Sequence, residues 1–314
     1  MPHLSPRHLT LLALAVLVAA IPWAFPSGYY FRVAALVWVS GLAAVGLQLL
    51  MGQAGQVSLG HAAFIGLGAY ACALGPKLLG LPVLACLPLG AALSGLLAFL
   101  VGRPILRLKG HYLAIATLGL GVLIALVISP ESGWTGGPDG MPVERLTLFG
   151  WRVSGSSTWY WVTGALLLVG TWIALNLDET PTGRAFRALH DSEVAAQVVG
   201  VDVARFKLQA FVIAAVYASL AGSALAFMNG FINPDQAGFL HSVELVTIVV
   251  LGGLGSVVGS IVGAAVLVTL PQALTVFHEY EHLLLGLIII VSMIFMRNGI
   301  VPSLSSLFLR RARS

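Results

Sequence analysis

One pattern in the sequence has the spacing of a zinc-binding motif. His278, Glu279 and His282 form HExxH, which on a helix places two imidazoles one turn apart for zinc, with the glutamate as base. This pattern supports the hypothesis of an intramembrane metalloprotease. However, it falls in an expected outer loop, and no carboxylate follows it that could complete the site. We therefore favour a polar interfacial turn and expect no catalytic residue and no metal site.

A glycine-rich stretch offers a second chemistry. Gly253, Gly255 and Gly259 resemble a loose dinucleotide-binding fingerprint, but no βαβ unit with an acidic ribose ligand surrounds them. Gly255, Gly259 and Gly263 repeat every four residues, which in lipid is typical of a face that packs closely against another helix. We favour this packing interpretation.

Polar residues interrupt the apolar sequence once near its beginning. Three glycines and four polar side chains lie between two apolar segments in residues 52–61, which predicts a helix that breaks near the bilayer. Transporters bind polar substrates with the backbone groups of such breaks. A glycine-lined packing site or a tight cytoplasmic turn is an equally good interpretation. The candidate translocation-pathway residues are Gln53, Gln56, Ser58, His61, Gly252, Gly253 and Gly255.

The polar stretch 178–207 has the features of two short helices. Thr180 can cap the first helix with Pro181 in its first position, and Asp191 or Ser192 can cap the second. Arg184 and Arg187 could rest on lipid headgroups. The stretch carries five acids against four bases, so we favour docking of a soluble partner. The second helix can end at Gly200, and Asp202 can start the next span. The candidate docking residues are Arg184, Arg187, Asp191, Glu193 and Gly200.

Composition decides which solvent these elements need. Only 9% of the 314 residues are charged and 58% are hydrophobic, against roughly 25% charged in soluble domains. The mean hydropathy is +0.96. A soluble enzyme, a disordered chain and a nucleic-acid-binding module are excluded, and we expect no nucleic-acid partner. The lipid bilayer must surround much of the surface.

We predict an all-α polytopic membrane protein of about ten transmembrane segments with glycine-broken helices, forming a single transmembrane domain over residues 1–314. The first segment resembles a signal peptide, but further segments follow at once, so we expect it to stay uncleaved. The segments are 9–25, 33–51, 62–78, 81–101, 112–128, 160–177, 206–228, 239–251, 256–270 and 283–296.

The basic residues predict the orientation of these segments. Arg103, Arg107 and Lys109 form one cluster, and a second cluster lies between Arg297 and Arg313; both should be cytoplasmic by the positive-inside rule. With Arg7 also inside, the number of spans is even and both termini are cytoplasmic. Residues 129–159 then form an extracytoplasmic loop, and residues 178–207 form helices on the cytoplasmic side.

The sequence lacks an energy source of its own. It contains no Gly-Lys dipeptide and therefore no Walker A loop. Glu244 is the clearest carboxylate within a span, and it lies near an end, whereas ion-coupled carriers usually need buried acids. This pattern is typical of a transport pathway that lacks its own energy source. A stand-alone carrier or channel for small polar solutes is the alternative.

Several motifs resemble those of the branched-chain amino acid ABC transporter permeases. They cover nearly the whole chain: GQAGQVSLGHAAF at 52–64, GLGAY at 66–70, GHYLAIATLG at 110–119, TGRAFRAL at 182–189 and LGGLGS at 251–256. Lys207, Ala210 and Phe211 resemble the M-type permease of Leu/Ile/Val importers. The general docking motif of importers has a glycine six positions after its glutamate, whereas Gly200 comes seven after Glu193.

The resemblance implies partners and a location. An H-type permease, two cytoplasmic ATPase subunits that bind the ATP, and an extracytoplasmic substrate-binding protein would complete the importer, and this chain would bind no cofactor itself. The complex would lie in the cytoplasmic (inner) membrane of a bacterium. The helices of residues 178–207 would act as cytoplasmic coupling helices that transmit ATP-driven motion to the spans.

Overall fold

The computed structural model describes residues 6–129, 135–148 and 151–273, together with residues 286, 290 and 299–303. Its α-helices are α1 (Pro6–Ala24), α2 (Gly28–Gln48), α3 (Ala62–Leu79), α4 (Cys86–Ile105), α5 (His111–Ile128), α7 (Ser156–Glu179), α8 (Pro181–Asp191), α9 (Glu193–Val198), α10 (Val203–Asn229), α11 (Phe239–Gly252) and α12 (Val257–Ala273). A π-helix, η1 (Leu49–Gln53), extends α2, and 3-10 turns form η2 (Val83–Ala85), η3 (Gly137–Asp139) and η4 (Pro234–Ala237).

Within the described residues, seven helices are long and apolar enough to cross a membrane, and α11 and α12 are shorter apolar helices. These nine correspond to the first nine predicted segments, so a polytopic helical membrane protein is confirmed. The tenth predicted segment, 283–296, lies largely outside the described residues, as do His278, Glu279 and His282. The total of ten spans and the cytoplasmic location of the termini stay predictions.

Small residues bring the central helices together. α10 packs against α2, α3 and α4, and α2 also packs against α7 and α12. A Cβ at Gly222 of α10 would collide with the Ile65 carbonyl of α3, and a Cβ at Gly68 would collide with the Ser219 carbonyl. Close backbone approach of this kind is how helices associate in lipid, where the hydrophobic effect offers little.

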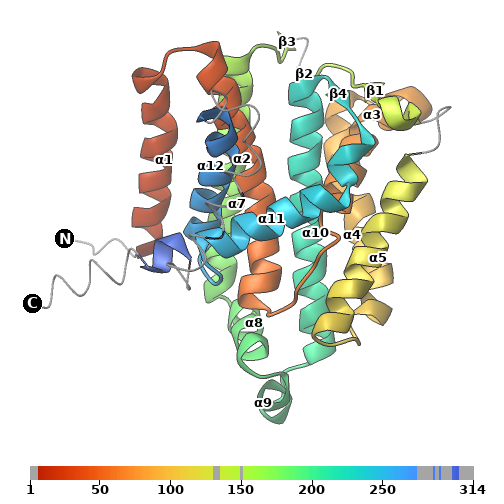
Figure 1. Ribbon diagram of the computed structural model, residues 1–314, viewed down its shortest axis with the longest axis vertical. Helices are drawn as coiled ribbons and strands as arrows, with labels where there is room; N and C mark the ends of the chain where they lie inside the picture. Colours follow the sequence, from red (N-terminus) through yellow and green to blue (C-terminus); the bar gives the residue numbers. More distant parts are fainter. Residues whose placement is uncertain are drawn as a thin grey trace, which may run out of the picture.

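The helices α11 and α12 form a glycine-packed pair. α11 crosses obliquely in front of the bundle, and α12 returns beside α2 (Figure 1). A Cβ at Gly263 would collide with the Ile248 carbonyl, and one at Gly259 would collide with the Gly252 carbonyl. The predicted packing face is therefore confirmed for Gly259 and Gly263. Gly255 lies instead in the connecting turn, with a left-handed φ of 87°.

The two long polar stretches lie at opposite ends of the helices (Figure 1). The described part of 129–159 contains η3 and the short strands β1 (Met141–Pro142), β2 (Thr147–Leu148) and β3 (Trp151–Arg152), and its last residues begin α7. β1 pairs with β4 (Phe231–Ile232), and β2 pairs with β3. We refer to this end as the outer end and to the end with α8 and α9 as the inner end. The assignment of the inner end to the cytoplasm stays a prediction.

The helix caps predicted for residues 178–207 are confirmed. Thr180 accepts a hydrogen bond from the Gly183 amide, with Pro181 in the first position of α8. Ser192, rather than Asp191, caps α9 and accepts from the Ala195 amide. Asp202 accepts from the Arg205 amide at the start of α10. Gly200 follows α9 with φ 85°, a conformation that suits glycine.

Candidate functional site

The predicted helix break is an irregular segment, residues 54–61, that we call the break loop. It follows the course of α10: the Gln56 side-chain amide donates to the Lys207 carbonyl (3.3 Å), and His61 Nε2 donates to the Ala214 carbonyl (3.0 Å). Lys207 lies in the second turn of α10, and Ala214 lies near its middle. The break loop therefore reaches from the inner end toward the middle of the bundle and is not a tight surface turn.

Side chains of two other helices fix the upper part of the break loop. The Leu59 amide donates to Thr117 Oγ1 of α5 (3.1 Å), and the Ala62 amide donates to Ser242 Oγ of α11 (3.0 Å). A Cβ at Gly60 would collide with the Thr117 carbonyl. Glycine is therefore required here by the close approach of α5, and the free backbone donors of the break find partners within the chain.

The polar side chains of this region face the interior of the chain. Gln53, Gln56, Ser58 and His61 are each 4% exposed or less. Among the described residues, Gln53 Oε1, Gln56 Oε1, Ser58 Oγ and His61 Nδ1 have no hydrogen-bond partner. Four such atoms in one short segment are unusual, because buried polar atoms are normally paired.

Val57 faces outward between these inward-facing side chains and is exposed. It was not singled out from the sequence, because a lone valine between Gln56 and Ser58 gives no sign of the side that it faces. A translocation pathway along the exposed surface of this chain would therefore meet Val57. Gln56 and Ser58 would become accessible only after a rearrangement.

The structure brings the end of α2 and η1, just before the break loop, against the glycine turn of residues 252–255. A Cβ at Gly52 would lie against the amide of Gly255. With its carbonyl oxygen turned toward this point, Gln48 accepts from the amides of Gly255 and Ser256, the latter at 2.8 Å. Gln48 is fully buried and was missed, although a lone glutamine in the apolar segment 33–51 was a signal.

The candidate docking residues at the inner end are mostly engaged within the chain. Arg187 forms an ion pair with Asp178 and also donates to the Asp178 carbonyl (2.7 Å). Arg184 donates to the Glu179 carbonyl (3.0 Å). Both arginines thus fasten α8 to the end of α7. Asp191 is exposed, 3.7 Å from His190 Nδ1.

Glu193 connects α9 to the bundle. It forms an ion pair with Lys207, whose side chain is 4% exposed, and lies 3.7 Å from the ammonium group of Lys109. Since the Lys207 carbonyl accepts from Gln56, one residue links α9 to the break loop. His190 of α8 lies against Gly55: a Cβ added at Gly55 would be 3.2 Å from the Cα of His190. The inner helices therefore contact the break loop directly at Gly55 and are linked to it a second time through Lys207 of α10.

The tip of α9 presents apolar side chains that the sequence analysis did not identify. Val194, Val198 and Val199 are 67–82% exposed at the inner end. Exposed apolar groups gathered beyond the ends of the spans are typical of a protein–protein contact.

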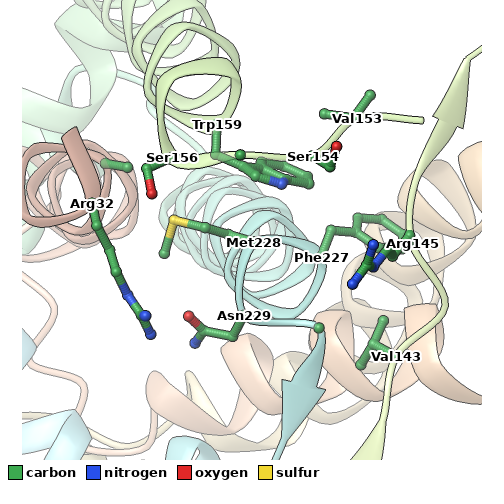
Figure 2. A pocket seen from close by; sticks show the side chains of 13 residues that line it. Arg32, Val143, Arg145, Val153, Ser154, Ser156, Trp159, Phe227, Met228 and Asn229 are labelled. Atoms are coloured by element: carbon green, nitrogen blue, oxygen red, sulfur yellow. The ribbon is translucent and has the colours of Figure 1, made fainter. Parts of the chain in front are cut away.

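At the outer end, a cavity of about 510 Å³ lies where α2, α7 and α10 meet the loop after β1. Figure 2 shows Arg32 and Arg145 on opposite sides of this cavity, with Met228 and Asn229 between them and Trp159 above. None of these residues was singled out from the sequence, because they come from four distant segments.

Comparisons with known proteins agree with this architecture. Residues 29–293 match the family described as branched-chain amino acid transport system / permease component. The chain is 34% identical to the high-affinity branched-chain amino acid transport system permease protein LivM of Salmonella typhimurium and 33% identical to LivM of Escherichia coli K12; each alignment covers 93% of this chain and 75% of the relative. It is 28% identical to the autoinducer 2 import system permease protein LsrC of Escherichia coli O9:H4, over 92% of this chain and 86% of the relative. No solved structure matches.

The family match covers most of the chain and includes the break loop, α8, α9 and the glycine turn. The alignments with the two LivM relatives also cover nearly the whole length of this chain. Members of this family are transport subunits rather than enzymes. The chain belongs to the family of permease components of branched-chain amino acid transport systems.

Proposed function

We propose that this chain is the M-type permease subunit of an ATP-driven importer for branched-chain or related amino acids in the cytoplasmic (inner) membrane of a bacterium. It works with an H-type permease, two cytoplasmic ATPase subunits and an extracytoplasmic binding protein. The observation that carries the proposal is the match to the LivM relatives over 93% of the chain. The name of the LsrC relatives points to another imported molecule, so the family alone leaves the substrate open.

The inner end supports a role in coupling to the ATPase subunits. The apolar tip of α9 (Val194, Val198 and Val199) is the part that a soluble partner can cover. Motion of α9 reaches Lys207 through Glu193, and it reaches the break loop through the Gln56 hydrogen bond. Alternating access needs a segment with two arrangements. The break loop is suited to this role because its buried polar atoms can gain partners in a second arrangement.

Reconstitution tests the assignment. Proteoliposomes containing all five components should accumulate labelled leucine on addition of ATP. The chain alone, supplied with a proton or sodium gradient, should not accumulate it. Concentrative uptake by the chain alone would instead identify a stand-alone carrier.

A charge at the α9 tip tests the coupling role. Val198→Asp should release the ATPase subunits, because it places a carboxylate in an apolar contact. Thr147→Asp adds the same charge at an exposed position of the outer end and should leave assembly unchanged. Copurification of the ATPase subunits measures both variants, and normal retention in Val198→Asp would remove the α9 tip from the interface.

A further inference from the structure

The outer cavity has an unbalanced charge. Arg32 and Arg145 are the charged residues among those that line it. In the part of the chain that the structure describes, neither arginine takes part in an ion pair. Both arginines are exposed at the cavity, so they give it a positive potential while staying accessible to a ligand. The cavity is therefore electrostatically suited to an anion.

The rest of the lining combines polar and apolar groups. The Asn229 amide lies between the two arginines, while Trp159, Phe227 and Met228 supply apolar surface (Figure 2). Guanidinium groups bind carboxylates with paired, charge-assisted hydrogen bonds. The volume of about 510 Å³ is within the range of small-molecule sites. Such a lining fits a carboxylate that carries a short apolar chain.

We propose that the outer cavity binds small aliphatic carboxylates, with Arg32 and Arg145 attracting the carboxylate from opposite sides and the apolar chain against Met228 and Trp159. As an entry site for leucine or its relatives, this inference rests on the proposed function. No carboxylate lines the cavity within the described residues, so the α-ammonium group of an amino acid gains no ion pair. The site therefore recognises the acid group and the side chain but not the ammonium group.

Three probes of the same carbon skeleton test this recognition. The full-length chain in lipid nanodiscs is titrated calorimetrically with 4-methyl-2-oxopentanoate, leucine and leucinamide. The oxo acid should bind most tightly, because it has a carboxylate and no ammonium group. Leucine should bind more weakly, and leucinamide should not bind. Equal binding of leucinamide and the oxo acid, or no binding of the oxo acid, would overturn the proposal.

Substitutions locate the site. Arg32→Gln and Arg145→Gln should each weaken oxo-acid binding roughly ten- to hundred-fold, since each removes a charge-assisted contact. Arg152→Gln is the matched control, because Arg152 is an exposed arginine of β3 outside the cavity lining. If Arg32→Gln folds poorly, Arg32→Lys is measured in its place. It keeps the positive charge and should retain part of the affinity. Unchanged affinity in both folded Gln variants would rule out the arginines.

The same variants show whether the arginines bind a small carboxylate or an acidic side chain of the binding protein. If the chain binds no oxo acid but the Gln variants lose capture of the binding protein, the arginines form a docking surface and the proposal is wrong. The site and the proposed function also fail separately. Arginine-dependent oxo-acid binding without ATP-driven leucine uptake would keep the site and reject the importer. Normal ATP-driven leucine uptake in chains that bind no oxo acid would keep the importer and reject the site.

Discussion

The break loop and the α8–α9 region meet at Gly55 and are linked through Lys207 of α10, yet they are built in opposite ways. In α8 and α9, Thr180 and Ser192 satisfy the helix amides, and Arg187 and Glu193 have ion-pair partners. In and beside the break loop, backbone amides are satisfied, but four buried side chains each keep an unpaired polar atom.

This difference separates a rigid element from one with a conformational choice. A fully paired polar region holds one arrangement, because every alternative loses hydrogen bonds. A region with unpaired buried atoms loses less when it rearranges and gains when water or substrate arrives. The α8–α9 region is therefore suited to transmit motion, and the break loop is suited to respond to it.

The largest expected effect comes from the ion pair that joins the two regions. Glu193→Ala should lower the free energy of unfolding by about 3–5 kcal/mol, because it leaves the buried Lys207 ammonium without its partner. Lys207→Met should cost less, since Glu193 is 28% exposed and stays near Lys109. Thermal unfolding of both variants in nanodiscs measures the difference. Equal losses would mean that Lys207 is hydrated rather than buried.

A smaller loss is expected where the break loop passes α5. Gly60→Val should destabilise the protein by about 1–3 kcal/mol and reduce uptake, because the new side chain collides with the Thr117 carbonyl. Gly119 of α5 has open space around it, so Gly119→Val serves as the control and should change little. Wild-type stability in Gly60→Val would contradict the close approach of the two segments.

The cap of α9 tests the rigid region more gently. Ser192→Ala removes the hydrogen bond to the Ala195 amide and should cost about 1 kcal/mol. Ser192→Asp keeps a capping oxygen and should restore the stability. Hydrogen exchange of the α9 amides measures the change locally. Exchange that is unaffected in the Ala variant would show that packing, rather than the cap, holds α9.

The two regions also differ in what sequence could predict. The caps of α8 to α10 depend on residues three apart, so local pattern alone identified Thr180 and Asp202, and Ser192 as one of two candidates with Asp191. The polar residues of the break loop were found as well, but their inward orientation was not. Gln48 contacts the glycine turn and Glu193 contacts Lys207 across distant segments, and Arg32 and Arg145 line one cavity from distant segments. Their proximity depends on helix packing, which no local spacing encodes.

The smallest effect on stability is expected at Ser58, and it separates the regions most clearly. Ser58→Ala removes a hydroxyl that has no partner among the described residues. Deleting an unpaired buried polar group is neutral or stabilising, so the free energy of unfolding should rise by about 0–1 kcal/mol. Thr117→Val is the contrast, because it deprives the Leu59 amide of its acceptor and should cost about 1–3 kcal/mol.

Leucine uptake by the assembled importer then shows whether Ser58 acts in another arrangement of the break loop. If Ser58→Ala unfolds no more easily than the wild type but transports more slowly, the hydroxyl finds its partner during the transport cycle, in water or on the substrate. A stability loss above about 1 kcal/mol would mean that the hydroxyl is already bonded in the resting protein. In that case the break loop would be as fully paired as α8 and α9, and its role as the responsive element would lose its basis.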